Sequence, residues 1–256
     1  MFCSTGFEMM DQETSSYWRK LLGIDEPVPP NFLDRYKTFH SFLRPLFYAL
    51  VERLFLRFYC PEKVYGIENL PSKPPYIIAA NHGSAMDYVA VAWPMGERRD
   101  ELYPLVTKLF YDRPWSLFGI RVAANAVRID TEENFFPAMR VAVKILKAGK
   151  AVFIHPEGLR TLDGELLPFR PGVGVIAVET GAPIVPVYIH NTWKVLPTDK
   201  IFPRPYPVSV SFGKPITMEA YREKLKSAQA YDIYKEAAEE LKNRIVELAS
   251  KLGINI

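Results

Sequence analysis

A histidine and an aspartate five positions apart, His82 and Asp87, follow a short apolar run at 76–80. Such a run is typical of a buried strand, so the pair falls on a turn between a strand and a helix. At this spacing the carboxylate can hydrogen-bond the imidazole, fix its tautomer and stabilise the imidazolium that forms when the ring takes a proton. The spacing therefore predicts a general base, His82, with Asp87 as its orienting partner.

The same turn also has a purely structural interpretation. Ser84 and Asp87 have the spacing of a capping box, in which Ser84 would be the N-cap and Asp87 would lie in the first helical turn. His–Asp pairs at this spacing also arise by chance. On the spacing alone, the capping interpretation is preferred.

A second set of polar residues follows another predicted strand, at 151–154. Gly158 allows the backbone to approach a ligand closely, and Arg160 supplies a forked donor that matches a phosphate group. Glu157 could orient Arg160 or bind a ligand hydroxyl. The alternative is an ordinary turn that carries an exposed ion pair.

The ordered combination of these two loops resembles the glycerolipid (lysophospholipid) acyltransferase family, and within it the bacterial 1-acylglycerol-3-phosphate acyltransferases. The pattern is Asn-His-x-Ser-x-x-Asp at 81–87 and Pro-Glu-Gly-x-Arg-Thr at 156–161. It continues in Phe-Arg-Pro-Gly at 169–172 and Ala-Pro-Ile-Val-Pro-Val at 182–187. The combination is far more specific than either loop alone.

The resemblance implies transfer of a fatty acyl group from acyl-CoA or acyl carrier protein to the free hydroxyl of 1-acylglycerol-3-phosphate, which gives phosphatidic acid. His82 would deprotonate that hydroxyl, and Asp87 would orient His82. The alternative acceptor is another lysophospholipid or a glycolipid. No metal and no cofactor are expected beyond the thioester cosubstrate. The residues expected to bind substrate are Glu157, Gly158, Arg160, Thr161, Arg128 and Lys108.

The sequence departs from the family pattern at three positions. The second family block usually contains a glycine before its arginine, whereas Ala-Asn-Ala-Val-Arg at 124–128 has none, so Arg128 is matched on weaker grounds. Leu159 stands where threonine is usual, and His155 stands where an aromatic or aliphatic residue is usual. We expect His155 to be structural.

The scaffold that carries these loops has an alternating pattern. Short apolar runs at 76–80, 102–107, 151–154 and 184–189 alternate with stretches of helical periodicity, and Val208–Phe212 alternates as a more exposed strand does. Strands that alternate with helices predict an α/β fold, with a mostly parallel central sheet and helices on both faces.

The N-terminal part differs from the rest, so we expect a helical membrane-contact region at 1–60 and an α/β acyltransferase domain at 61–256. Residues 31–60 carry five Arg or Lys against two acids, a net charge of +3, interleaved with phenylalanines. A basic, aromatic, amphipathic helix is typical of a membrane interface. The alternative is a helix packed on the core with snorkelling arginines. The membrane interpretation places the protein on the cytoplasmic face of the cell membrane, as a peripheral or monotopic protein that contacts it through 15–60.

Composition excludes several other classes. The chain has 256 residues, 48% of them hydrophobic and 24% charged, and a net charge of +3. These values are typical of a folded domain rather than a disordered chain, and the charge is too small to indicate nucleic-acid binding. Cys3 and Cys60 form no CxxC motif, which argues against a zinc ribbon. We find no apolar run long enough to span a membrane and no signal peptide at 1–16.

Three rival functions share some of these features. An α/β-hydrolase requires a G-x-S-x-G elbow, which the sequence lacks. The glycine pattern that begins at Gly172 is similar to a dinucleotide fingerprint, but no acidic residue occurs in the next predicted strand. A non-catalytic membrane-surface binding protein remains an alternative, because it would need only the basic N-terminal region.

Overall fold

The computed structural model describes residues 14–36, 43–50, 57–112, 120–130, 135–200 and 202–256. Its described strands form one seven-stranded sheet in the order β1-β7-β6-β2-β5-β3-β4. The strands β6, β2, β5, β3 and β4 run parallel, whereas β7 is antiparallel to β6 and parallel to β1. In chain order they are β1 (Glu62–Tyr65), β2 (Ile77–Ala80), β3 (Leu102–Thr107), β4 (Val127–Ile129), β5 (Ala151–Ile154), β6 (Ile184–His190) and β7 (Val208–Phe212). The predicted mostly parallel sheet is confirmed.

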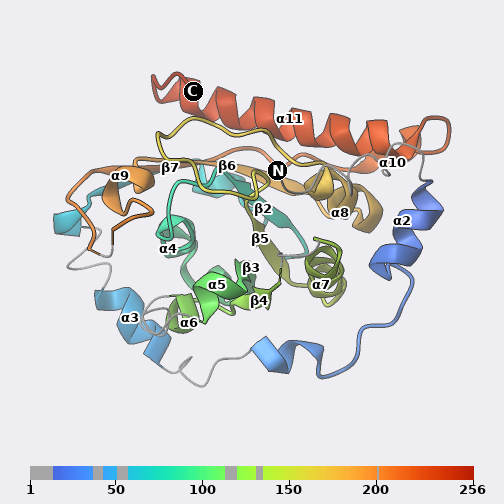
Figure 1. Ribbon diagram of the computed structural model, residues 1–256, viewed down its shortest axis with the longest axis horizontal. Coiled ribbons are helices and arrows are strands. Elements are labelled where there is room, and N and C mark those ends of the chain that lie inside the picture. The colour runs from blue at the N-terminus through green and yellow to red at the C-terminus, as the bar shows by residue number, and fades with distance from the viewer. Residues whose placement is uncertain (1–13, 37–42, 51–56, 113–119, 131–134, 201) are drawn as a thin grey trace.

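Helices cover both faces of this sheet, and strand β2 shows why. Ile77 and Ala79 point into one apolar core, and Ile78 and Ala80 point into the other, as the two-residue period of a strand requires. The first core is covered by α2 (Ser15–Leu22), α7 (Phe136–Lys147), α8 (Gly172–Thr180) and α11 (Ala230–Lys251). The second is covered by α3 (Arg44–Leu50), α4 (Asp87–Ala92) and α6 (Ile120–Ala123). Figure 1 shows the long α11 along one side of the molecule and α3 on the opposite side.

Shorter helices complete the described elements. They are α5 (Lys108–Tyr111), α9 (Thr192–Val195) and α10 (Glu219–Lys224), with 3-10 turns at Phe32–Tyr36, Ile67–Asn69 and Trp93–Glu101. The apolar stretch at 123–129 also reads as a short strand in the sequence, but only its second half is one, because α6 ends at Ala123 and only Val127–Ile129 pair with β3. The intervening Asn125 turns inward, where its amide donates to the carbonyl of Asp100 at 2.8 Å.

Helix α8 approaches α11 unusually closely. A Cβ atom at Gly174 would lie 2.0 Å from the carbonyl oxygen of Tyr234, so only glycine fits there. The glycine pattern that resembled a dinucleotide fingerprint is therefore explained by helix packing.

The predicted N-terminal membrane region does not behave as one unit. Trp18 and Leu22 of α2 are fully buried, and Phe32 is nearly so. The guanidinium of Arg19 pairs with Glu179 of α8. The described residues 15–36 therefore pack on the core of the sheet domain.

Candidate active site

His82 and Asp87 lie together on the turn between β2 and α4. The Nδ1 atom of His82 is 2.9 Å from Oδ2 of Asp87, whose side chain is buried. The same oxygen accepts hydrogen bonds from the backbone N–H groups of Gly83 at 2.9 Å and Ser84 at 3.0 Å. One carboxylate oxygen thus orients His82 and also holds the backbone of the turn, whereas α4 begins at Asp87 with Met86 at its N-cap, so the prediction that Ser84 is the N-cap is wrong.

The charge state of Asp87 suits an orienting role. Burial alone would raise the pKa of Asp87, but its hydrogen bond to His82 and the neighbouring imidazoles outweigh this and lower the pKa. An ionised carboxylate can only accept, so His82 carries its proton on Nδ1 and presents Nε2 as a base. This is the tautomer that deprotonation of a hydroxyl requires.

The backbone of His82 is held by the loop that follows β5. Its N–H donates to Oε1 of Glu157 at 2.6 Å, and its carbonyl accepts from the N–H of Thr161 at 2.8 Å. The other carboxylate oxygen of Glu157 accepts from the N–H of Leu167 at 2.8 Å. The two sequence motifs therefore form a single hydrogen-bonded unit.

This arrangement corrects the predicted role of Glu157. Glu157 was expected to bind the glycerol phosphate, but it is buried and both its oxygens accept hydrogen bonds from backbone amides. Burial raises the pKa of Glu157 to about 7, although the two backbone hydrogen bonds oppose the shift. The structure gives Glu157 a supporting position behind the catalytic turn.

Thr161 and Gly158 also differ from the prediction. The hydroxyl of Thr161 is buried, donates to Asp163 at 2.7 Å and accepts from the N–H of Gly164. Gly158 has a left-handed backbone with φ of 73°, and its N–H donates to the carbonyl of His155. Thr161 and Gly158 therefore contribute to the backbone geometry of this loop.

The basic residues predicted to bind the acceptor lie at the carboxyl ends of the parallel strands. Parallel strands end at the same edge, so Lys108 after β3 and Arg128 in β4 share the edge that carries His82 and Arg160. The Arg128 guanidinium forms two hydrogen bonds to Asp112, at 2.9 and 2.7 Å, and is half exposed. Lys108 is exposed, and Arg160 is half-buried.

Two further residues support the turn and were not predicted as site residues. The amide of Asn81 extends the ladder between β2 and β6, because it donates to the carbonyl of Ile189 at 2.8 Å and accepts from the same residue's N–H at 2.7 Å. The hydroxyl of Thr192 faces Asp87 and contributes to lowering its pKa. Asn81 stands in the family pattern, which was a usable signal, whereas Thr192 lies outside every motif.

Within the described part of the chain, His82, Asp87 and His155 form a group close enough together to consider as metal ligands. The two imidazole rings are stacked, with centroids 3.8 Å apart and planes 9° apart. Nitrogen lone pairs lie in the ring planes, so those of two stacked rings cannot converge on one ion. This geometry does not fit a metal centre.

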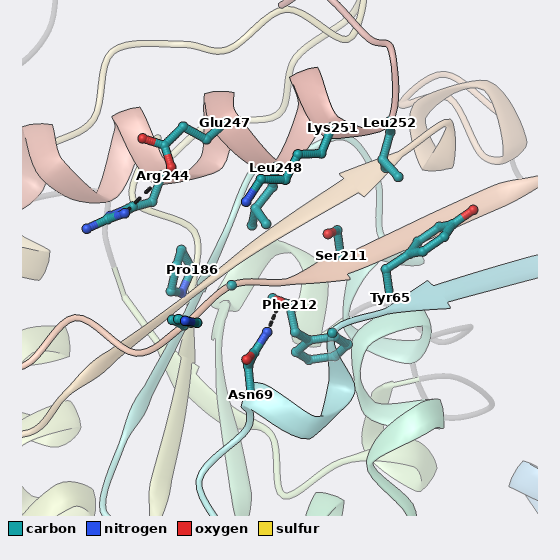
Figure 2. Close-up of a pocket in the computed structure, with 13 residues that line it drawn as sticks. Tyr65, Asn69, Pro186, Ser211, Phe212, Arg244, Glu247, Leu248, Lys251 and Leu252 are labelled. Carbon is teal, nitrogen blue, oxygen red and sulfur yellow. Dashed lines mark hydrogen bonds and ion pairs between the residues drawn. The ribbon is translucent and has the colours of Figure 1, made fainter.

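A hollow of about 380 Å³ lies elsewhere, between β7 and the last turns of α11 (Figure 2). Its lining includes Asn69, Phe212 and Leu248, with Arg244 and Glu247 paired at its rim. None of the predicted site residues lines it. It is therefore separate from the catalytic turn.

Comparison with known proteins decides the family. A family model described as Acyltransferase matches residues 62–190, which include both motif loops. The chain belongs to the acyltransferase family. The match begins at β1 and ends with β6, so it contains every residue of the catalytic turn and of the loop that supports it.

Relatives of this chain are named 1-acyl-sn-glycerol-3-phosphate acyltransferases. The chain is 31% identical over 176 residues to the chloroplastic 1-acyl-sn-glycerol-3-phosphate acyltransferase BAT2 of Brassica napus, covering 64% of this chain and 46% of that protein. It is 29% identical over 124 residues to the 1-acyl-sn-glycerol-3-phosphate acyltransferase of Bacillus subtilis, covering 48% of this chain and 60% of that protein. The chain thus spans about half the length of the curated relatives it matches.

A solved structure supports the fold. The 1-acyl-sn-glycerophosphate acyltransferase PlsC of Thermotoga maritima has a TM-score of 0.56 and 23% identity, over 90% of this chain and 95% of that one. Among the helices that the structure describes, none combines the length and the apolar character needed to cross a bilayer.

Proposed function

We propose that this protein transfers a fatty acyl group from a thioester donor to the free hydroxyl of 1-acylglycerol-3-phosphate, giving phosphatidic acid. The observation that carries the proposal is the Nδ1–Oδ2 hydrogen bond of 2.9 Å between His82 and the buried Asp87, on a turn that the second motif clamps in place. The similarity to proteins named 1-acyl-sn-glycerol-3-phosphate acyltransferase supports this acceptor. A different lysolipid acceptor would use the same chemistry.

The reaction follows from the tautomer of His82. Its Nε2 takes the proton from the acceptor hydroxyl as the hydroxyl oxygen attacks the thioester carbonyl carbon. A C–O bond forms, and the tetrahedral intermediate then expels the thiolate by breaking the C–S bond. The imidazolium returns its proton to the departing sulfur, so His82 and Asp87 end as they began. No step requires a covalent acyl-enzyme.

The acceptor phosphate is assigned to the basic residues at the same edge of the sheet. Arg160 lies three residues beyond Glu157, in the loop that clamps His82, so its backbone belongs to the same hydrogen-bonded unit. A guanidinium can bind a phosphate with two parallel hydrogen bonds. We assign Lys108 to the same phosphate, and Arg128 as well, once the phosphate replaces Asp112 as the partner of its guanidinium.

We also propose that the protein works at a membrane surface, and the structure changes which residues would carry this contact. Arg44 is one of the five basic residues of 31–60, but it is buried and donates hydrogen bonds to Val122, Asp100 and Asn125, so it is not available to lipid phosphates. Its neighbour Tyr48 is buried as well. The exposed side chains here are instead apolar: Leu46 and Leu50 of α3 have exposed fractions of 68% and 56%, and Leu43, just before the helix, has 38%.

Apolar insertion would therefore carry more of the binding than arginine contacts. Phe58 is 74% exposed and adds to this apolar surface after α3. Arg57, also exposed, remains available for anionic lipid, while Arg53 lies outside the described residues. The contact would be made on the cytoplasmic face of the cell membrane.

The decisive experiment is a turnover assay with purified protein. The protein is offered a panel of lysophospholipids with acyl-CoA and, separately, acyl carrier protein as donor, and products are identified by mass spectrometry. We expect phosphatidic acid from 1-acylglycerol-3-phosphate and none from the His82→Ala variant. Vesicle binding without any product would instead support the non-catalytic membrane-binding alternative. The donor that gives turnover decides between CoA and the carrier protein.

A further inference from the structure

His155 occupies a position that the reaction scheme does not use, yet it is the residue most closely packed on the catalytic ring. Its imidazole stacks on that of His82, with centroids 3.8 Å apart and planes 9° apart. Its Nε2 is 4.0 Å from the same Asp87 oxygen that holds His82. His155 therefore touches both members of the catalytic pair.

The orientation of His155 is itself fixed from two sides. Its Nδ1 lies 3.0 Å from the carbonyl oxygen of Ala80, and since a carbonyl only accepts, Nδ1 must carry the proton. Phe153, two residues earlier on β5, meets the His155 ring edge to face at 4.7 Å, and Tyr88 of α4 meets Phe153 in the same way at 5.7 Å. A column of rings thus runs from the core, through Phe153 and His155, to His82.

Burial keeps His155 neutral in the working pH range. It lowers the pKa of His155 to about 3, and the neighbouring His82 adds to this effect. His155 then takes no part in the proton transfer, which the reaction scheme assigns to His82 alone. A neutral ring face also stabilises a cation stacked upon it, as an imidazolium at His82 would be.

We propose that His155 is a positioning residue, whose ring fixes the plane of the His82 imidazole so that Nε2 points at the acceptor hydroxyl. The hydrogen bond to Asp87 alone leaves the His82 ring free to tilt about that bond, and the stacked ring removes this freedom. The inference rests on the proposed function for its kinetic consequences but not for the geometry.

Three substitutions at position 155 distinguish the effect of the ring face from the effects of the ring nitrogens and of side-chain volume. His155→Phe keeps a flat ring but loses the ring nitrogens, and with them the hydrogen bond to Ala80. His155→Leu fills similar space without a ring face, and His155→Ala removes the contact. We expect His155→Phe to retain kcat within about threefold, whereas Leu and Ala lower kcat about 10- to 100-fold with KM for both substrates nearly unchanged, as expected for a misaligned catalytic group.

A second measurement needs no turnover. Crystal structures of the wild type and the three variants report the plane of the His82 ring. We expect the same plane in the wild type and in His155→Phe, and a tilted or multiply placed His82 ring in His155→Leu, with the hydrogen bond to Asp87 kept in each protein. Melting temperatures identify any variant that merely fails to fold.

The outcomes are distinct. If His155→Leu matches His155→Phe both in kcat and in the plane of the His82 ring, the positioning role is overturned. If the ring planes differ as expected but neither the wild type nor any variant transfers acyl groups, the proposed function fails while the positioning role stands.

Discussion

The backbone N–H of His82 lies 2.6 Å from Oε1 of Glu157, although 75 residues separate the two in sequence. Strands β2 and β5 are neighbours in the sheet, so the turns after them meet at one edge. The acidic residue of the second motif therefore acts through the backbone of the first. The two motifs are therefore linked structurally, because the loop of the second holds the turn of the first in place.

Removing the base tests the mechanism most directly. We expect His82→Ala to lower kcat by about 10²–10⁴-fold, the usual contribution of a general base, and Asp87→Asn to have a smaller but clear effect. Both variants should stay folded, because the clamp on the His82 backbone remains. Steady-state kinetics with matched melting curves check this, and near-normal turnover by His82→Ala would exclude the mechanism.

The buried carboxyl of Glu157 predicts a pH dependence of stability. Its pKa is raised from 4.5 to about 7 by burial, so between these values the unfolded chain releases a proton that the folded protein keeps. The contribution of Glu157 to the free energy of unfolding therefore falls as pH rises from 4.5 to 7 and is constant above that.

Glu157→Gln is the matched control for this titration, because it cannot ionise. It loses one of the two acceptors for backbone amides, which costs about 1–3 kcal/mol at low pH. We expect the stability advantage of the wild type over this variant to shrink as pH rises, in chemical unfolding monitored across that range. A difference that stays constant with pH would contradict the raised pKa.

Arg160 is expected to discriminate between the two substrates. Arg160→Ala should raise KM for the phosphate-bearing acceptor by about 10- to 100-fold, since a charge-assisted hydrogen bond contributes about 1.5–3 kcal/mol. The KM for the thioester donor should change little, and lysine should restore only part of the loss, because it lacks the forked geometry. Equal damage to both substrates would assign Arg160 to the loop structure instead.

The two faces of α3 predict opposite phenotypes. Replacing Leu46 and Leu50 together with asparagine should weaken binding to vesicles about 10- to 100-fold without loss of stability, because each buried leucine contributes about 1.5–3 kcal/mol when fully transferred. Arg44→Gln should do the reverse, and lower the free energy of unfolding by about 1–3 kcal/mol through its lost buried hydrogen bonds. Co-sedimentation and thermal unfolding distinguish them, and vesicle binding that depends on Arg44 but not on the leucines would refute this assignment.

Most strands of the sheet, and their alternation with helices, could be predicted from the sequence. The runs at 102–107 and 151–154 are strands residue for residue, because a buried strand needs a continuous apolar run and these two have sharp polar borders. The alternating run at 208–212 is also a strand over its predicted length, but it is mostly buried, so the prediction that it is more exposed was wrong. The membrane region was harder, since aromatic and basic residues suit an interface and a core equally well. Only tertiary packing shows that Trp18 faces the core while Leu46 faces outward.

The sequence predicts which residues form the site better than it predicts what each of them does. The His82–Asp87 pair is local, so spacing alone could place it. The roles of Glu157 and Thr161 depend on backbone amides of distant segments, which no side-chain pattern reveals. The stacking of His155 on His82 likewise depends on the register of β2 against β5.

The clamp on His82 also separates the groups that shape the catalytic turn from the group that performs the chemistry. The hydrogen bonds that hold the backbone of His82 come from Glu157 and Thr161, and neither depends on the imidazole. A protein without its base should accordingly keep a preformed site for donor and acceptor together. His82→Ala is thus a natural choice for trapping an unreacted ternary complex, in which the path of the acyl chain could be seen directly.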